Sequence, residues 1–398
     1  MMRLRAMVLA LLAACGPAAV AAGQNIVAES AADRILPPRD VAADDARRLV
    51  DRVVEFGPRA AGPEADRTAA KLDAHVAEFV AGFPWKAFHV TLGISGYETY
   101  FNHPDEMFYA LSAALPYLKP ETAAAVRKFL AGQLLACPPY APDGFDNTAG
   151  RPREAYDVPE GIRVKGRGKA ASAFGVYAFW SYCRRTGDKE APARHLPAVR
   201  RRMAPLLDGT YSFEPAARHT NDEAERLNGD LAGLVGLARL ARMAGQEDDP
   251  AVLDKIRELL GLRVNLERTN PAILEPTRAA TKQLHNVRLA RYADLVPEVA
   301  LEVAVLSDGA ARDRVQAFRE ARNAWHLAFT ERLVGGENYV SPPHMGRAMM
   351  AAACFIEDLP PEQYPTFIDV PWCKGDFYFI EKCAYALLRS AGNREAGP

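Results

Sequence analysis

The sequence of 398 residues has no run of basic residues long enough to make a polybasic arm, and its formal net charge is -1. This balance gives no global field to hold nucleic acid, so we expect neither DNA nor RNA as a partner. Cysteine is scarce, at six residues with no CxxC pair, which argues against a zinc site and favours buried packing for most of them. Strand and hairpin-turn signals are sparse, which argues against a sheet. The hydrophobic content of 49% is typical of a globular protein. The sparse strand signals predict that this protein is mostly helical.

The N-terminus carries an export signal. Arg3 and Arg5 precede a short apolar stretch at 6–14, which is far below the roughly 20 residues of a spanning helix. Residues 12–15 resemble a bacterial lipobox, in which Cys15 would be acylated, while residues 19–21 suit ordinary signal peptidase. Both outcomes predict an exported protein that is periplasmic, anchored to the membrane through Cys15, or secreted.

The predicted helices are of two kinds. After a hairpin at 41–56 and 64–79, one kind is apolar nearly all round and must be surrounded by protein: 107–118, 170–183, 227–241, 345–356 and 377–388. The other kind is amphipathic: 121–135, 193–207, 250–262 and 310–333. The two kinds largely alternate along the chain. The alternation predicts about six helical hairpins, each contributing one inner and one outer helix to a closed double ring.

One domain is expected to hold all of these helices. We place an export signal at 1–22, a linker at 23–40, the domain at 41–391 and a disordered tail at 392–398. Gly229, Gly233 and Gly236 lie on one inner helix at spacings that allow another backbone to approach closely. Segment 277–308 is hard to assign because Pro297 interrupts it. Strands are expected at most around 88–94 and 162–164.

Polar clusters stand just before the apolar helices or in their first turn. They lie at 102–106, 165–169, 218–223 with Asn228 and Asp230, 341–344 and 371–376. Inner helices of such a ring run parallel, so these clusters would converge. The acids and amides have a plainer explanation, because they cap helices and complement the helix dipole. Histidine is not a favoured cap, and the recurrence of His103, His219 and His344 at equivalent positions favours a functional site.

This pattern of inner and outer helices, with polar and aromatic residues at the inner-helix N-termini, resembles the (α/α)6-toroid carbohydrate-active enzymes. These are the six-hairpin glycosidases and the toroid polysaccharide lyases. The resemblance covers roughly 41–388 and is architectural, with no strict family motif matched. It implies an all-α toroid with few short strands. It also implies an extracytoplasmic enzyme that cleaves glycosidic bonds of a polysaccharide or oligosaccharide where the inner helices begin.

β-Elimination from a uronate is the first chemistry that the resemblance implies. It needs a group that neutralises the sugar carboxylate, a base for the adjacent proton and an acid for the leaving oxygen. Toroid lyases resemble one another in using Asn, His, Tyr and Arg for these tasks. The matching catalytic candidates are Tyr100, Asn102, His103 and His219, and the matching substrate-binding candidates are Arg218 and Asn221.

Hydrolysis by paired carboxylates is the alternative chemistry. Its catalytic candidates are Asp105, Asp230 and Asp376, with Asp222 as a further carboxylate, and substrate binding would fall to Asp222, His344, Trp372 and Tyr378. Residue types do not choose between the two chemistries. Elimination is slightly favoured, because capping explains the carboxylates better than the histidines.

A non-catalytic surface protein that binds glycan or a protein partner through the same cleft is the rival from a different class. A toroid that processes isoprenoids is disfavoured, because the sequence has neither a DDxxD run nor a Cys/His/Asp metal set. We expect no cofactor and no catalytic metal. The spacing of the Asp and Glu residues leaves a structural calcium open.

Overall fold

The fold is all-α, as predicted from the sequence. The computed structural model describes residues 39–57, 61–82, 104–141, 172–210, 220–268, 294–313, 315, 350–357, 360 and 377–390. Most of these residues are helical and none of them forms a strand. The predicted export signal, the two short strands and the predicted helix beyond residue 315 lie outside the described residues. Among the helices described, none has the length and apolar character needed to cross a membrane.

The helices agree well with the predicted segments. Their bounds are α2 (Ala43–Asp51), α3 (Pro63–Gly82), α6 (Pro104–Ala114), η1 (Leu115–Tyr117), α7 (Pro120–Ala136), α8 (Phe174–Thr186), α9 (Ala191–Asp208), α10 (Thr220–Met243), α11 (Pro250–Arg268), α14 (Pro297–Leu306), η3 (Ala353–Glu357) and α18 (Phe377–Ser390). Several begin with proline, whose fixed φ suits the first helical position and whose missing N–H would have no partner there. Local sequence therefore sets many of the helix starts.

Both predicted kinds of helix are present. Every residue of α6 (Pro104–Ala114) is buried, as are residues 174–183 of α8. In α9, by contrast, Leu196, Val199 and Met203 are buried at helical spacing, while the arginines between them reach solvent. The all-round apolar helices are thus inside, and the amphipathic ones face water.

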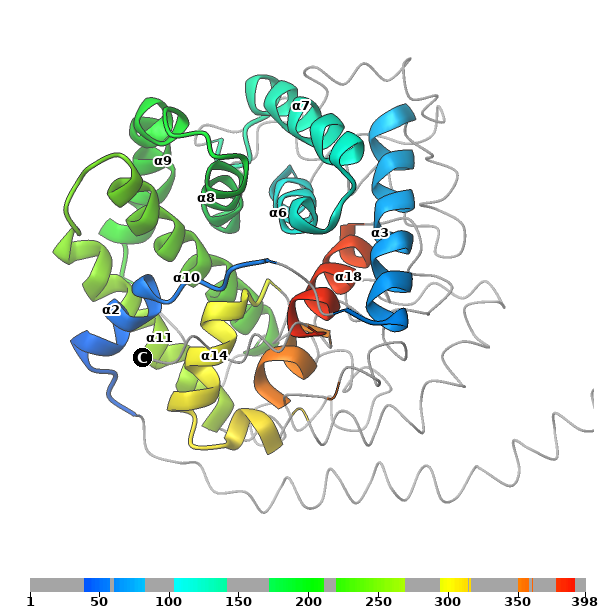
Figure 1. The fold of residues 1–398 in the computed structure, drawn as a ribbon. Coiled ribbons are helices and arrows are strands. Elements are labelled where there is room, and N and C mark those ends of the chain that lie inside the picture. Colours follow the sequence, from blue (N-terminus) through cyan, green and yellow to red (C-terminus); the bar gives the residue numbers. More distant parts are fainter. Residues whose placement is uncertain are drawn as a thin grey trace, which may run out of the picture.

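The buried elements follow one another around the centre of the molecule (Figure 1). α6 packs against α8, α8 against α10, α10 against α14, α14 against η3, η3 against α18, and α18 against α6. Outside them, α3 contacts α18 and α7, α9 and α11 contact α10, and α2 contacts α11. A continuous hydrophobic core runs through these elements.

Glycines bring α10 and α8 into close contact, as predicted from their spacing. A Cβ atom on Gly233 would lie 2.4 Å from the carbonyl oxygen of Ala173, and one on Gly236 would lie 2.7 Å from the Cα of Tyr177. Real Cβ atoms essentially never approach other atoms closer than 3.0 Å. The two backbones could not meet at this distance with larger residues on α10.

The helices α6, α8 and α10 run in the same direction, because residues near the start of one helix contact residues near the start of the next, and later residues contact later ones. The Ser172 hydroxyl, just before α8, donates a hydrogen bond to the carboxylate of Asp105 at the start of α6. Further along both helices, Phe108 packs against Tyr182, with ring centroids 5.6 Å apart. The glycine contacts give the same order for α8 and α10. The N-termini of α6 and α8 therefore lie together, as predicted for inner helices.

The predicted helix over 41–56 is wrong beyond Asp51. Residues 52–57, here called the N-terminal strap, are not helical, and Arg52 at its start is extended, with ψ 110°. The strap's backbone groups bond buried side chains instead of forming helical hydrogen bonds. The Val54 N–H donates to the Glu298 carboxylate at 3.1 Å, and the Arg52 carbonyl accepts from Arg239. Tertiary hydrogen bonds thus override the local helical periodicity.

Pro297 does not interrupt a helix, contrary to the sequence-based interpretation of segment 277–308. It is the first residue of α14, and Val296 before it is extended, with φ -78° and ψ 154°. Proline disfavours the helical conformation of the preceding residue, so it marks a helix start here.

Candidate functional site

A small cavity lies where α6, α8 and α18 meet the segment that leads into α14. Its lining consists of Tyr109, Phe174, Asp294, Leu295, Val296, Ala351, Glu381 and Tyr385. The cavity volume is about 10 Å³, which is room for about one water molecule. Two carboxylates and two tyrosine hydroxyls in one lining are groups that can exchange protons with a bound water or ligand.

Asp294 reaches the cavity from the turn before α14. Its φ of 54° is left-handed, a conformation that Asp adopts more readily than most residues. Its Oδ2 atom would lie 3.8 Å from a Cβ on Gly229, and so would the Cβ of Phe174. These are ordinary contact distances, so the Asp294 carboxylate lies beside α10 at Gly229.

Glu381 and Tyr385 approach the cavity from α18, one helical turn apart and therefore on the same face. Glu381 is only 1% exposed. The hydroxyl oxygens of Tyr385 and Tyr109 lie 2.8 Å apart, at hydrogen-bond distance. Burial raises the pKa of Tyr109 well above 10, and Tyr385 and the charge of Glu381 add to this effect. Tyr109 therefore keeps its hydroxyl proton at physiological pH.

Two of the carboxylates predicted from sequence act electrostatically on one arginine. Asp105 at the start of α6 and Asp230 on α10 both raise the pKa of Arg202 on α9, against the larger lowering effect of its burial. Asp105 is buried and also accepts the Ser172 hydrogen bond. Asp105 and Asp230 thus act electrostatically on Arg202, and their predicted role in the site stays a prediction.

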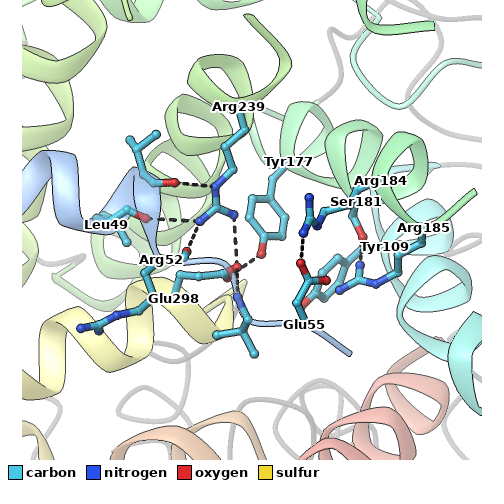
Figure 2. Close-up of polar contacts among 12 residues, drawn as sticks. Leu49, Arg52, Glu55, Tyr109, Tyr177, Ser181, Arg184, Arg185, Arg239 and Glu298 are labelled. Atoms are coloured by element: carbon cyan, nitrogen blue, oxygen red, sulfur yellow. Dashed lines mark hydrogen bonds and ion pairs between the residues drawn. The ribbon is translucent and has the colours of Figure 1, made fainter. Parts of the chain in front are cut away.

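A buried ion pair beside Tyr177 of α8 joins the N-terminal strap to the buried helices (Figure 2). Arg239 on α10 and Glu298 on α14 are 4% and 0% exposed, with Nη1 and Oε1 3.1 Å apart. The Tyr177 hydroxyl donates to the other Glu298 oxygen at 2.5 Å. Arg239 also donates to the backbone carbonyls of Leu49, Val50 and Arg52. These hydrogen bonds compensate the burial of both charges.

Most residues predicted from sequence lie outside the described residues. These are Tyr100, Asn102, His103, Arg218, His219, His344, Trp372 and Asp376. Asn221 and Asp222 lie in the first turn of α10, and Tyr378 in the first turn of α18, but only their helix positions are described. The predicted convergence of the histidines therefore stays a prediction.

The sequence-based site missed Asp294 and Glu381. Asp294 precedes a buried helix, as the other predicted polar residues do, but its helix went unrecognised because Pro297 was interpreted as an interruption. The signal for Glu381 was its charge, which with that of the adjacent Lys382 interrupts an apolar helical segment. A charge that no polar face accommodates must point to a partner or a cavity.

The cysteines that the structure describes are packing residues, as expected. Cys137, Cys183, Cys354 and Cys383 are buried and unbridged. Burial is the main cause that raises the pKa of the Cys183 thiol, which makes it unreactive. In the same described ranges, no three His, Cys, Asp or Glu side chains gather as metal ligands would.

Comparisons with known proteins assign no family. No protein-family model, no curated protein and no solved structure matches the chain. Function is therefore argued from the chain's own site geometry.

Proposed function

We propose that the chain is a six-hairpin (α/α) toroid that hydrolyses glycosidic bonds at the cavity lined by Asp294 and Glu381. The toroid is supported by the series of packed elements from α6 through α8, α10, α14 and η3 to α18, which returns to α6. The positions of α3, α9 and α11 outside this series support an outer layer. In the enzymes that the chain resembles, substrate lies where the inner helices begin. Phe174 and Asp294, at the starts of α8 and α14, line the cavity there.

One observation carries the proposed reaction: two carboxylates line a cavity the size of a water molecule. Hydrolysis of a glycosidic bond uses two carboxyl groups that flank the bond. One protonates the leaving oxygen, and in the single-displacement route the other activates a water.

The two carboxyl groups differ in burial, and this assigns their roles. Glu381 is almost fully buried, which favours a neutral carboxyl, so it donates its proton to the glycosidic oxygen as the bond to the anomeric carbon breaks. Asp294 is half-buried and serves as the carboxylate. It takes a proton from the attacking water as the water oxygen bonds to the anomeric carbon.

The cavity favours hydrolysis over β-elimination. Its carboxylates match the needs of hydrolysis. The residues that elimination would use, Tyr100, Asn102, His103 and His219, lie outside the described residues and carry no weight in this choice. Elimination remains the sequence-based alternative, and binding of a glycan or a protein without catalysis is the alternative from another class. The experiment below separates all three.

We also propose that the substrate is a polysaccharide or oligosaccharide outside the cytoplasm. The charged and apolar segment at 1–22 supports export, and Cys15 supports a lipid anchor, with cleavage after residue 21 as its alternative. Cys15→Ser should release the protein from membranes if the anchor exists. Unchanged membrane partitioning of that variant would contradict lipidation.

The purified chain is assayed on a panel of neutral and uronate-containing polysaccharides, following new reducing ends for hydrolysis and ultraviolet absorbance for unsaturated products of elimination. Asp294→Asn and Glu381→Gln should each lower hydrolysis by about 10² to 10⁴-fold, because each removes a proton-transfer group. Asp254→Asn is the matched control, an exposed carboxylate on α11 whose loss should leave turnover unchanged. Asp105→Asn and Asp230→Asn should have much smaller effects, because neither residue lines the cavity.

Each other outcome points to a different function. Near-native hydrolysis by both Asp294→Asn and Glu381→Gln would remove the reaction from this cavity. Unsaturated product, lost in His103→Ala, would establish elimination. Tight glycan binding with neither product would place the chain among binding proteins.

A further inference from the structure

Arg185 in the last turn of α8 has no acidic partner among the residues that the structure describes, whereas its neighbour Arg184 pairs with Glu55. The Arg185 Nη1 atom donates a hydrogen bond to the Ser181 hydroxyl (Figure 2), and its guanidinium carbon lies 4.3 Å from the centre of the Phe56 ring. Its Nε atom is buried, and no described residue accepts a hydrogen bond from it. Arginine only donates hydrogen bonds, so this nitrogen needs an acceptor that these residues do not supply.

Two hydroxyl protons near Arg185 also lack an acceptor within the described part of the chain. They belong to Tyr117 of η1 and Ser112 of α6, which are 7% and 0% exposed. Burial raises the pKa of Tyr117 against the smaller lowering effects of the Arg185 charge and the Gly57 backbone N–H. The Tyr117 hydroxyl therefore keeps its proton at physiological pH and lies within electrostatic range of Arg185.

The packing of α6 against α8 places Ser112 and Arg185 at the same level. Phe108 packs against Tyr182, with ring centroids 5.6 Å apart. Ser112 and Arg185 follow them by four and three residues, so each lies one turn further along the same helix face. Tyr117 comes next, in η1 directly after α6. The three donors therefore gather where α6 and α8 end.

We propose that Arg185, Tyr117 and Ser112 form a binding site for a small anion, either a halide or the carboxylate group of an organic acid. An anion accepts hydrogen bonds and donates none, so a single ion can satisfy all three donors. A water molecule would bring two protons that need acceptors of their own. The positive charge of Arg185 favours the anion further, because hydrogen bonds between charged groups are the stronger ones.

Arg185 can meet an ion at the edge of its guanidinium. Phe56 of the N-terminal strap covers one face of this planar group, which leaves the N–H groups at its edge to donate in the plane. Arg185 is only partly buried, so an ion can reach it from solvent. The site is separate from the proposed hydrolysis, because none of its three donors lines the cavity.

Offsetting the helix dipole is the alternative role of Arg185. Arg184 and Arg185 both lie in the last turn of α8, where cations complement the partial negative charge of the helix end. That role requires no bound ion and applies to both arginines alike. The proposed site instead predicts that only Arg185 binds an anion, since the Arg184 guanidinium already pairs with Glu55. Arg184 is therefore the matched control.

Chloride binding to the full chain is followed by the line width of the chloride-35 nuclear magnetic resonance signal, which broadens when ions exchange with a protein site. The broadening should saturate with chloride concentration at constant ionic strength. Arg185→Gln should abolish it, while Arg184→Gln should leave it unchanged. Tyr117→Phe and Ser112→Ala each remove one donor with little change in shape, and each should weaken chloride binding by about tenfold.

Competition with formate and glucuronate distinguishes the two sources of the anion. Loss of the broadening with neither competitor assigns the site to halides, and displacement by formate assigns it to small carboxylates as well. Displacement by glucuronate extends it to the carboxylate of a sugar acid. Equal broadening in the parent chain, Arg185→Gln and Arg184→Gln would overturn the site, because chloride would then bind elsewhere. The absence of saturable broadening would overturn it too, as would unchanged affinity in both Tyr117→Phe and Ser112→Ala.

Discussion

Gly229 and Gly233 lie one helical turn apart on α10, and changing each to alanine should have opposite effects on stability. Alanine in place of glycine inside a helix favours folding by roughly 0.5 to 1 kcal/mol, because it restricts the unfolded chain. This gain is the same at both positions. The difference between the variants therefore reports what each new methyl group meets.

The new methyl group at Gly233 meets the backbone of α8. A Cβ there would lie 2.4 Å from the carbonyl oxygen of Ala173 and 2.8 Å from its carbonyl carbon, so a helix must shift. Overpacking of this kind costs about 1 to 3 kcal/mol. After the alanine gain, a net loss of up to about 2.5 kcal/mol remains. At Gly229 the nearest atoms are 3.8 Å away, an ordinary contact, so the variant should gain up to about 1 kcal/mol.

Equilibrium unfolding in urea measures both free energies, since a change in midpoint at constant slope is a change in stability. Gly236→Ala serves as a second test, because its Cβ would lie 2.7 Å from the backbone of Tyr177. If Gly233→Ala proved as stable as Gly229→Ala, α8 and α10 would not approach as closely as described. The packing of neighbouring buried helices would then need revision.

Two further predictions concern buried charge. Burial lowers the pKa of His75 from 6.5 to about 4, so the unfolded chain binds this proton more tightly and the unfolding free energy should fall by up to about 3 kcal/mol as pH drops from 6.5 to 4. Urea unfolding across this range should show a smaller decrease for His75→Phe, and an equal decrease would contradict the assignment. Arg239→Met should cost about 3 to 5 kcal/mol, because it leaves Glu298 charged and buried, while adding Glu298→Met should recover much of the loss. Thermal unfolding of the single and double variants tests this, and a neutral single variant would refute it.

Local patterns predicted most of the helices. The apolar periodicity that predicts 121–135, 193–207 and 250–262 corresponds to α7, α9 and α11, because periodicity depends only on neighbours in sequence. The helix over 41–56 failed at its C-terminal end. There, Arg239 and Glu298 form hydrogen bonds with the strap backbone from distant helices, and no local pattern carries that information.

The candidate site was less predictable than the fold. Asp105 and Asp230 were chosen for their places near helix starts. Neither lines the cavity, and both act electrostatically on Arg202. Asp294 was missed because a proline such as Pro297 can either interrupt a helix or be its first residue, and the sequence does not distinguish the two. Glu381 was missed because a single acid in an apolar helix gives no indication of what it faces.

The sequence alone determined the helical class, the inner and outer faces of the helices, and the glycines where backbones meet. Each of these follows from spacing within one segment, since a helix repeats every 3.6 residues. Only the tertiary structure decided which carboxylates share a cavity and which charges pair. The cavity joins Tyr109, Phe174, Asp294 and Glu381, which are distant in sequence and adjacent only after the helices pack. Their proximity depends on helix order and crossing, which the local pattern of hydrophobic residues does not encode.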